Sequence, residues 1–401
     1  EGYFTVLAEM GDFVDYQSLS IQLPFDLIVR LDRPENPWDV LQACLRAGLM
    51  EHPQVVLAGF EAYNTSAGRV RELLAGPDAG PSFIPPDKYA QRMALRKAWP
   101  RFPQPEFRFF ASPLSIRDAR DALLYPCVIK PVDGGGGLGI WLVEEASQLD
   151  AVIGKLVETM NYGGRGFSGF IVESWLPGDE YSLQGVVDNG HAVALTCCQK
   201  VIEHHIDEEG CISFYESGHV AMAAQQLPAA FASLMSFCCE TFGYRQGAFH
   251  IDFIMVNGEP HFLEMGFRLS GMGVVNLVEE VTGINWAEVA FQIEAGRGLP
   301  VLRFPDQPQA IGRLRLRQRL QYDAAERWIA QHQRGQLLPP LNLPALAVSP
   351  RSSLYADLTR HAGILATFRL AAESRDDVLA VFQQILDVPS LATRRDLLCA
   401  E

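Results

Sequence analysis

A run of four glycines, Gly134–Gly137, lies between two apolar segments in the stretch Tyr125–Glu145, "YPCVIKPVDGGGGLGIWLVEE". Glycine loses more conformational entropy on folding than any other residue, so such a run weakens a packed core. The flanking segments "CVIK" and "GIWLV" are typical of buried strands. A Walker-type loop or a dinucleotide fingerprint leads from a strand into a helix, whereas this loop leads into a second strand. The stretch therefore predicts the tip of a β-hairpin that can fold over a ligand.

Lys130 ends the strand that precedes the glycines. Lysine is seldom buried without a partner, and a phosphate group is a good one. The backbone N–H groups of Gly134, Gly135, Gly136 and Gly137 could reach phosphate oxygens, because no Cβ separates them from a ligand. The glycine run alone fits a polyphosphate site and a flexible surface hairpin equally well.

Asp252 and Glu264 each interrupt a run of apolar and aromatic residues, "FHIDFIMV" and "HFLEMGF". They are twelve positions apart across Asn257-Gly258, a pair that is a strong signal for a tight hairpin. Two facing carboxylates repel each other unless a cation lies between them. Mg²⁺ prefers oxygen ligands and commonly bridges protein carboxylates to phosphate oxygens. The pair predicts a Mg²⁺ site, with two edge-strand acids facing water as the alternative.

Glu173 and Glu180 bracket a Pro-Gly turn in "FIVESWLPGDEYSLQGVV". The apolar pair Trp175 and Leu176 could form a hinge whose backbone groups suit a purine. A carboxylate beyond the turn could accept hydrogen bonds from ribose hydroxyls. Taken alone, these residues favour an ordinary hairpin with two solvated acids.

Arg268 follows Glu264 by four positions and begins "RLSGMG". Its guanidinium could clamp a carboxylate or a developing oxyanion, or it could simply pair with Glu264. Lys200 either points at the phosphates or merely ends a strand. The doublet His204-His205, in an acidic stretch, predicts a mobile loop rather than a metal site. For the other single histidines of this region the sequence predicts no chemistry: His250 and His261.

Apolar runs alternate with helical patterns from the start of the chain. This alternation predicts a small α/β domain with a parallel sheet over roughly the first hundred residues. A Pro/Gly-rich connector then leads into a helix after Asp87, a good N-cap residue. In the first domain we expect strands at 4–10, 26–31 and 54–60 and a helix at 38–50.

From Phe107 to about Asn161 the pattern predicts strand, helix, strand, glycine loop, strand and helix. A Pro-rich connector near the end leads to one strand and one helix that cap the fold. Between these regions we expect strands at 170–187 (with the turn), 190–205, 248–256 and 260–269, and a helix at 228–243; the connector is 338–350 and the cap 363–387.

The chain has 401 residues and is acidic, with 48 Asp and Glu against 33 Lys and Arg and a formal charge of -15. That balance disfavours nucleic acid and anionic membranes as partners, because both reward clustered cations. The eight cysteines form no CxxC pair, which predicts a reduced intracellular compartment. There is no apolar run long enough to cross a bilayer and no signal pattern at the start, so the expected location is the cytoplasm.

Four segments that are weak alone occur here in one order and at sensible intervals. Together they resemble the ATP-grasp superfamily, specifically its carboxylate–amine (carboxylate–thiol) ligases. The resemblance runs from Asp87 to about Gly283 and is looser before and after. The four segments are "DKYAQRMAL", "YPCVIKPVDGGGGLGIWLV", "FIVESWLPGDEYSLQGVV" and "GAFHIDFIMVNGEPHFLEMGFRLSG".

This resemblance implies an ATP-grasp fold of mixed α/β and α+β class, in which two lobes hold ATP beneath the glycine hairpin as a lid. Members are often homodimers, and the sequence itself carries no signal for an oligomeric state. The implied parts are an N-terminal α/β (pre-ATP-grasp) domain at 1–105, a small lobe with the lid at 106–172, a large lobe with the metal site at 173–300 and a C-terminal α+β cap at 301–401.

The resemblance also implies where ATP would lie. Lys88 and Lys130 would contact the phosphates, under the glycine loop. Glu173, together with the backbone of Trp175-Leu176, would meet adenine, and Glu180 would bind the ribose.

By the same resemblance, Asp252 and Glu264 would carry Mg²⁺, or Mn²⁺ in its stead, and Arg268 would face the acyl phosphate or the substrate carboxylate. Two positions depart from the pattern. Many members have Asn where this chain has Gly266, so one ion would have fewer protein ligands. D-alanine–D-alanine ligases carry Arg where this chain has His250, which argues against that activity and leaves any oxyanion role to Arg268.

The implied reaction joins a small-molecule carboxylate to an amine in two steps. The carboxylate takes the γ-phosphate of ATP to give an acyl phosphate, and the amine then displaces phosphate, so no protein nucleophile is needed. Small amino-acid-like substrates are expected, but the sequence does not say which. Two alternatives stay open: carboxyphosphate chemistry, as in biotin carboxylases and purine-pathway ligases, and a non-catalytic ATP-binding module.

Overall fold

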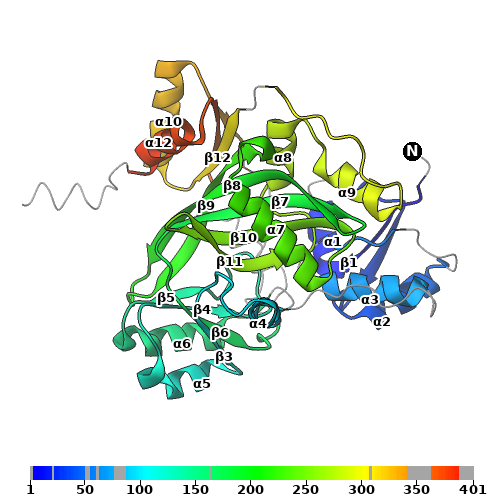
Figure 1. Ribbon diagram of the computed structural model, residues 1–401, viewed down its shortest axis with the longest axis horizontal. Helices are drawn as coiled ribbons and strands as arrows, with labels where there is room; N and C mark the ends of the chain where they lie inside the picture. Colours follow the sequence, from blue (N-terminus) through cyan, green and yellow to red (C-terminus); the bar gives the residue numbers. More distant parts are fainter. Residues whose placement is uncertain are drawn as a thin grey trace, which may run out of the picture.

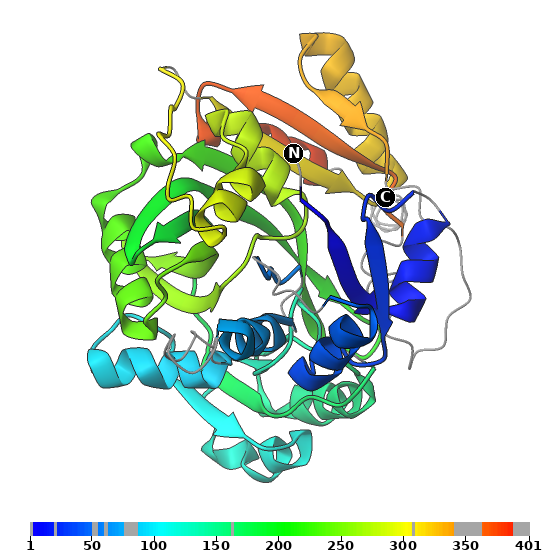
Figure 2. The same cartoon turned by 90° about the vertical axis from the view of Figure 1, so that its right-hand side faces the viewer.

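The computed structural model describes residues 3–19, 22–49, 55–59, 63–75, 87–161, 164–306, 309–340 and 363–387. In this part of the chain the strands form a two-stranded parallel sheet and one twelve-stranded sheet (Figure 1). Figure 2 shows the N-terminal unit, the middle of the chain and the C-terminal elements arranged around a common centre. No helix among the described residues has both the length and the apolar character needed to span a bilayer.

The N-terminal unit is built on a parallel sheet, as its alternating pattern predicts. β1 (Val6–Met10) pairs with β2 (Leu27–Leu31). The third expected strand is wrong in the part that the structure describes, because residues 55–59 form no strand. An apolar run becomes a strand only where a neighbour satisfies its backbone groups, and the described sheet consists of β1 and β2 alone. The helices of this unit are α1 (Gly11–Ser18), α2 (Pro37–Arg46) and α3 (Asn64–Ala75).

The next segment has the predicted order of strands and helices. β4 (Cys127–Pro131) pairs with β5 (Trp141–Val143) across the glycine loop, and with β6 (Phe170–Ser174) on its other side. β6 also pairs with β3 (Phe107–Phe110), and we call these four strands and their helices the small lobe. The helices of the small lobe are α5 (Pro113–Asp118) and α6 (Leu149–Glu158), and they share one core with its strands (Figure 1). α4 (Lys88–Ala98), which Asp87 caps as predicted, lies outside this core, because its buried Leu95 packs with strands further along the chain.

The turn at Pro177-Gly178 does not close a hairpin. The strand before it, β6, pairs with β3 and β4, whereas the strand after it, β7 (Asp179–Asp188), pairs with strands further along the chain. The chain therefore crosses at this turn from the small lobe to the remaining strands. Glycine is needed at 178, because a Cβ there would lie 2.1 Å from the carbonyl oxygen of Met255.

β8 (His191–Ile206) and β9 (Ile212–Ala223) form a long antiparallel pair. The prediction of a mobile loop at His204-His205 is wrong, since both residues lie in β8 opposite Phe214 and Ser213. The strand expected over 190–205 therefore includes the doublet, and the exposed end of β8 depends on β9 for its backbone hydrogen bonds. β9 also pairs with β5 and so joins the lid strands to the rest of the sheet.

The two segments that carry Asp252 and Glu264 form the predicted hairpin of β10 (Gly247–Val256) and β11 (Glu259–Gly266). Asn257 and Gly258 have φ of 51° and 83°, the positive values that a two-residue hairpin turn favours. β10 pairs with β7, and we call β7–β11 and their helices the large lobe. Those helices are α7 (Ala229–Phe242), α8 (Val274–Thr282) and α9 (Trp286–Glu294).

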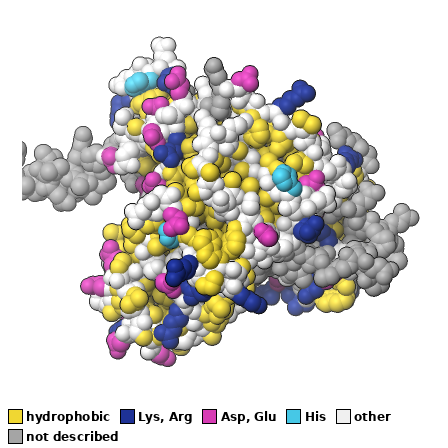
Figure 3. All heavy atoms as spheres, viewed as in Figure 1, with side chains coloured by type: hydrophobic (Ala, Val, Ile, Leu, Met, Phe, Trp, Pro, Cys, Tyr) yellow, Lys and Arg dark blue, Asp and Glu magenta, His cyan; other side chains and the backbone are white. Residues whose placement is uncertain are grey.

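The C-terminal elements continue the same sheet. β12 (Ala310–Leu316) pairs with β9 and with β14 (Ala366–Ala372), and the expected strand and helix of 363–387 are present. Most of the Pro-rich connector, 341–350, lies outside the described residues. Acidic and basic side chains are both scattered over the face seen in Figure 3. The remaining elements are α10 (Arg319–His332), β13 (Gln336–Leu338), α12 (Arg375–Leu386) and three 3-10 turns, η3 (Arg120–Ala122), η4 (Ala146–Gln148) and η5 (Ala224–Gln226).

Candidate active site

One cavity of about 450 Å³ lies where the two lobes meet. Its walls come from the start of α4, the glycine loop, the crossing between β6 and β7, and one face of β7–β11. The structure brings every site residue predicted from the sequence to this cavity: Lys88, Lys130, Gly134, Gly135, Gly136, Gly137, Glu173, Trp175, Leu176, Glu180, Asp252, Glu264 and Arg268.

Asp252 and Glu264 are direct neighbours across β10 and β11. Strand side chains alternate between faces, and this register places both carboxylates on the face that lines the cavity. Asp252 is 7% exposed, so the alternative of two water-facing edge acids does not fit it. The two acids have the placement that a shared cation requires, and their metal role stays a prediction.

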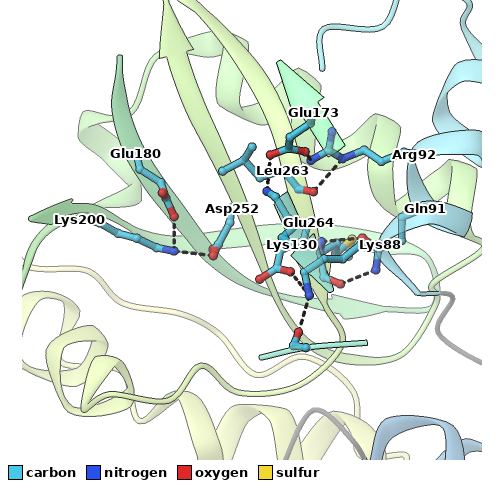
Figure 4. Close-up of polar contacts among 12 residues, drawn as sticks. Lys88, Gln91, Arg92, Lys130, Glu173, Glu180, Lys200, Asp252, Leu263 and Glu264 are labelled. Carbon is cyan, nitrogen blue, oxygen red and sulfur yellow. Dashed lines mark hydrogen bonds and ion pairs between the residues drawn. The ribbon is translucent and has the colours of Figure 1, made fainter. Parts of the chain in front are cut away.

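Each of these acids is paired with a lysine (Figure 4). Lys88 Nζ lies 2.7 Å from Glu264 Oε2, and Lys200 Nζ lies 2.6 Å from Asp252 Oδ2. Ser182 also donates a hydrogen bond to Asp252 at 2.6 Å. Burial acts to raise the pKa of Glu264, but Lys88 and the more distant lysines outweigh it and lower that pKa to about 2. Glu264 is therefore ionised and available to a cation at neutral pH.

The oxygen-only donor set fits Mg²⁺ better than a metal that is held by a protein cage. Among the described residues, no cluster of three or more His, Cys, Asp and Glu side chains could hold a metal ion. Two carboxylates would leave most coordination positions to nucleotide oxygens and water, and Mg²⁺ usually keeps several waters and binds through one or two carboxylates plus phosphates. Gly266 stands where many family members have asparagine, and the sequence therefore predicts an ion with fewer protein ligands; that stays a prediction.

Lys200 lies at the centre of an acidic group that the sequence did not reveal. Its Nζ contacts Glu180 Oε1 and Asp252 Oδ2, each at 2.6 Å, and lies 3.5 Å from Glu216 Oε2. Burial acts to lower the pKa of Lys200, but the three carboxylates raise it well above its usual value. Burial, together with Asp252, raises the pKa of Glu180 despite Lys200. Lys200 thus points into the cavity and does more than end a strand.

Glu173 has a different environment from the one expected for a residue that meets adenine. Its side chain is buried, and its two oxygens face Lys130 and Arg92. Burial acts to raise the pKa of Glu173, but these two cations outweigh it and lower the pKa. The carboxylate is therefore turned toward the cations, and its most direct task is to hold Lys130 in place.

The glycine loop needs glycine for backbone reasons as well as for access. Gly136, Gly137 and Gly139 have φ of 61°, 80° and 76°, values that residues with a Cβ seldom adopt. Lys88 donates a hydrogen bond to the carbonyl oxygen of Gly134, so a predicted phosphate lysine touches the predicted lid. The loop and both lysines thus line the same cavity.

Part of the cavity wall next to the glycine loop is apolar. Trp175 stacks on Phe214 of β9, with ring centroids 5.7 Å apart, and Val128 and Ile140 lie on the cavity wall. Flat apolar surfaces suit a purine ring. Phe214 was not predicted, because its place depends on β9, which the sequence pattern did not show.

Arg268 and His250 line the same cavity as Asp252 and Glu264. His250 Nδ1 is 3.3 Å from the carbonyl oxygen of Arg268, and the imidazole lies over Gly266, its partner across the strands. Glu264 is held by Lys88, so the simple pairing of Arg268 with Glu264 is not required. His261 contacts the backbone of Glu259 on its own strand.

The lowered pKa of Glu264 predicts a pH-dependent contribution to stability. A carboxyl group with a lowered pKa stabilises the fold above its ordinary value of 4.5, and this contribution is lost as the pH falls toward about 2. The free energy of unfolding of the wild type minus that of Glu264→Gln should therefore decrease between about pH 5 and about pH 3. Urea unfolding across this range tests it, with Glu259→Gln, an exposed change on the same strand, as the control. A difference that does not change with pH would contradict the lysine pairing.

A crossing between two lobes, a glycine loop and facing acids in one cavity are the features that the resemblance to the ATP-grasp class implies for a nucleotide site. Residues 86–272 match the family model described as ATP-grasp domain, so the chain carries an ATP-grasp domain. The resemblance drawn from the sequence and the predicted fold are confirmed by this match and by the structural neighbours.

Two curated relatives show weak sequence similarity. Dapdiamide A synthase of Enterobacter agglomerans is 23% identical over 162 residues, 40% of this chain and 37% of that protein. Formate-dependent phosphoribosylglycinamide formyltransferase of Wolinella succinogenes is 26% identical over 259 residues, 63% of this chain and 62% of that protein. The chain thus spans less than two thirds of the length of either relative.

Two solved structures share the fold over nearly the whole chain. The L-amino acid ligase from Bacillus licheniformis has a TM-score of 0.64 and 18% identity, covering 96% of this chain and 97% of that one. The ADP complex of N5-carboxyaminoimidazole ribonucleotide synthetase has a TM-score of 0.60 and 12% identity, covering 96% and 90%. The expectation that the chain is an ATP-grasp ligase agrees with these comparisons.

Proposed function

We propose that the chain is an ATP-dependent carboxylate–amine ligase that joins small amino-acid-like substrates through an acyl phosphate. One observation carries this proposal: Asp252 and Glu264 face each other in the cavity that Lys88, Lys130 and the glycine loop also line. Acids for a divalent ion beside phosphate-binding cations are the parts that phosphoryl transfer uses. The similarity to a dapdiamide synthase and to an L-amino acid ligase supports an amide-forming reaction.

In the proposed reaction a substrate carboxylate oxygen bonds to the γ-phosphorus of ATP, and the bond from that phosphorus to the β–γ bridging oxygen breaks, which releases ADP. An amine nitrogen then bonds to the acyl carbon, inorganic phosphate leaves, and the nitrogen gives up a proton. Mg²⁺ would neutralise charge on the nucleotide oxygens, held by Asp252 and Glu264.

The chain's own residues would position the reactants and exclude water. Lys88 and Lys130 would place positive charge beside the phosphates, and Arg268 would face the substrate carboxylate. The glycine loop, which lines the same cavity, would shield the acyl phosphate from hydrolysis. Trp175 and Leu176 would border the base, and Glu180 the ribose.

A second candidate function is carboxyphosphate formation from bicarbonate. The comparable similarity to N5-carboxyaminoimidazole ribonucleotide synthetase supports it, because the fold alone does not separate the two chemistries. A non-catalytic ATP-binding module is the third reading.

Release of ADP and phosphate against a panel of amino acids, alone and in pairs, tests the proposal. Formate and bicarbonate are added as separate arms. We expect release to rise only when an acid and an amine are both present, with a product of the mass of the acid plus the amine minus water. Stimulation by bicarbonate alone would favour the second candidate. Nucleotide binding without turnover in any arm would favour the binding module.

A further inference from the structure

One face of α4 holds the strand that carries Glu264. Lys88, Gln91 and Arg92 are spaced i, i+3 and i+4, so they project from the same side of the helix. β11 is the last strand of its sheet, and its outer edge is open to partners other than a strand. The three side chains bind three consecutive residues of β11, in the order Glu264, Met265 and Leu263.

At this edge Gln91 makes the backbone hydrogen bonds that a neighbouring strand would otherwise make. Its Nε2 donates to the carbonyl oxygen of Met265 at 2.8 Å, and its Oε1 accepts from the Met265 N–H at 2.9 Å. Arg92 Nε donates to the carbonyl oxygen of Leu263 at 2.9 Å. The backbone is thus fixed on both sides of Glu264, and so is the origin of its side chain.

Arg92 also reaches the small lobe (Figure 4). Its Nη2 donates to Glu173 Oε2 at 2.8 Å, and the other oxygen of Glu173 binds Lys130. Arg92 is 0% exposed, and a buried charge is costly unless it is well paired. A guanidinium offers rigid donors in several directions, which an apolar side chain of similar size would lack. This single side chain therefore joins β11 of the large lobe to β4 and β6 of the small lobe.

Neither Gln91 nor Arg92 is among the residues that line the cavity. They can affect a bound ligand only through the residues that they hold. We propose that Gln91 and Arg92 are positioning residues, which fix the metal acid Glu264 relative to the phosphate lysine Lys130. This rests on the proposed function for the identity of the ligands, ATP and a divalent ion.

Gln91→Leu and Arg92→Lys test the proposal. The first removes the bonds to Met265, and the second keeps a cation beside Glu173 but loses the fork that also reaches Leu263. We expect the affinity for Mn²⁺ in the presence of a non-hydrolysable ATP analogue to fall by about 10- to 100-fold in both, as for other residues that support metal ligands. The affinity for the analogue without metal should stay near the wild-type value. Electron paramagnetic resonance of Mn²⁺ and calorimetry measure the two affinities.

Arg96→Lys is the matched control, one turn further along α4, where Arg96 pairs with the exposed Glu106. Its two affinities should equal those of the wild type, and circular dichroism should show all three variants folded. Folded variants with unchanged Mn²⁺ affinity would overturn the proposal. An equal loss of both affinities would also overturn it, because that outcome indicates general damage rather than positioning.

The binding assays need no turnover, so they separate this proposal from the ligase activity. A wild type that binds Mn²⁺ and the analogue but forms no amide would overturn the proposed function and leave the positioning test in force. A wild type that binds neither would overturn both.

Discussion

Replacing Glu264 by Gln is expected to lower the rate of ADP release by about 100- to 1000-fold, as the loss of a preorganised charge at a reacting phosphate does. Gln keeps the size of the side chain and removes the charge that faces Asp252 and Lys88. The rate is measured with the substrate pair that the amino-acid panel identifies. Binding of Mn²⁺ with the ATP analogue gives a second readout, which should weaken in parallel.

Glu259→Gln is the control for this prediction, because Glu259 is an exposed acid on the same strand. It should retain the wild-type rate, and circular dichroism should show both variants folded. A Glu264→Gln enzyme that keeps more than about a tenth of the rate would be inconsistent with a residue that neutralises transition-state charge. In that case the charge of Glu264 would not be needed for turnover, and its proposed role as a ligand of the divalent ion would be wrong.

The pairing of Asp252 with Glu264 could be predicted because its causes are local. Asn257-Gly258 sets the turn and the register of the strands next to it, and a one-residue register shift between Asp252 and Phe253 then places Asp252 opposite Glu264. The cap by Asp87 and the strand pair around the glycines are local in the same sense. Where a few neighbouring residues determine the geometry, the sequence was enough to predict that geometry.

The crossing between the lobes could not be predicted in this way. Pro177-Gly178 has the composition of a hairpin turn, yet β6 and β7 pair with different strands. Gly178 is there because Met255, which is distant in sequence, approaches it closely. The choice of strand partners is a property of the whole sheet, and a turn sequence does not contain it.

Buried charges were missed for a related reason. Arg92 in "KYAQRMALRKA" looks like one of several cations on a solvated helix, and its burial depends on Glu173 and on the backbone of Leu263. Lys200 likewise acquires its role from Glu180 and Asp252 on other strands. A charge pairs with whatever the fold brings near, so the sequence shows the charge and not its partner.

Gly266 explains a departure that the sequence could only note. A Cβ at this position would lie 2.1 Å from Cε1 and 2.5 Å from Nε2 of His250, which is its direct partner across β10 and β11. His250 is buried, so its ring has little room to move aside. The two departures from the family pattern therefore belong together: the imidazole occupies the space that a side chain at 266 would need.

Gly266→Ala is accordingly expected to lower the free energy of unfolding by about 1–3 kcal/mol, the usual cost of overfilling a packed site. His250→Ala empties the space that the new methyl group enters, so the double variant should recover most of the loss that Gly266→Ala causes. A double-mutant cycle by urea unfolding measures this coupling, which is expected between residues in contact. Gly154→Ala is the control, because Gly154 lies in α6 with open space around it and alanine suits a helix. Additive effects of the two changes would show that His250 is not the reason why residue 266 must be glycine. The packing of His250 on Gly266 would then have no bearing on Glu264, two positions earlier in the chain.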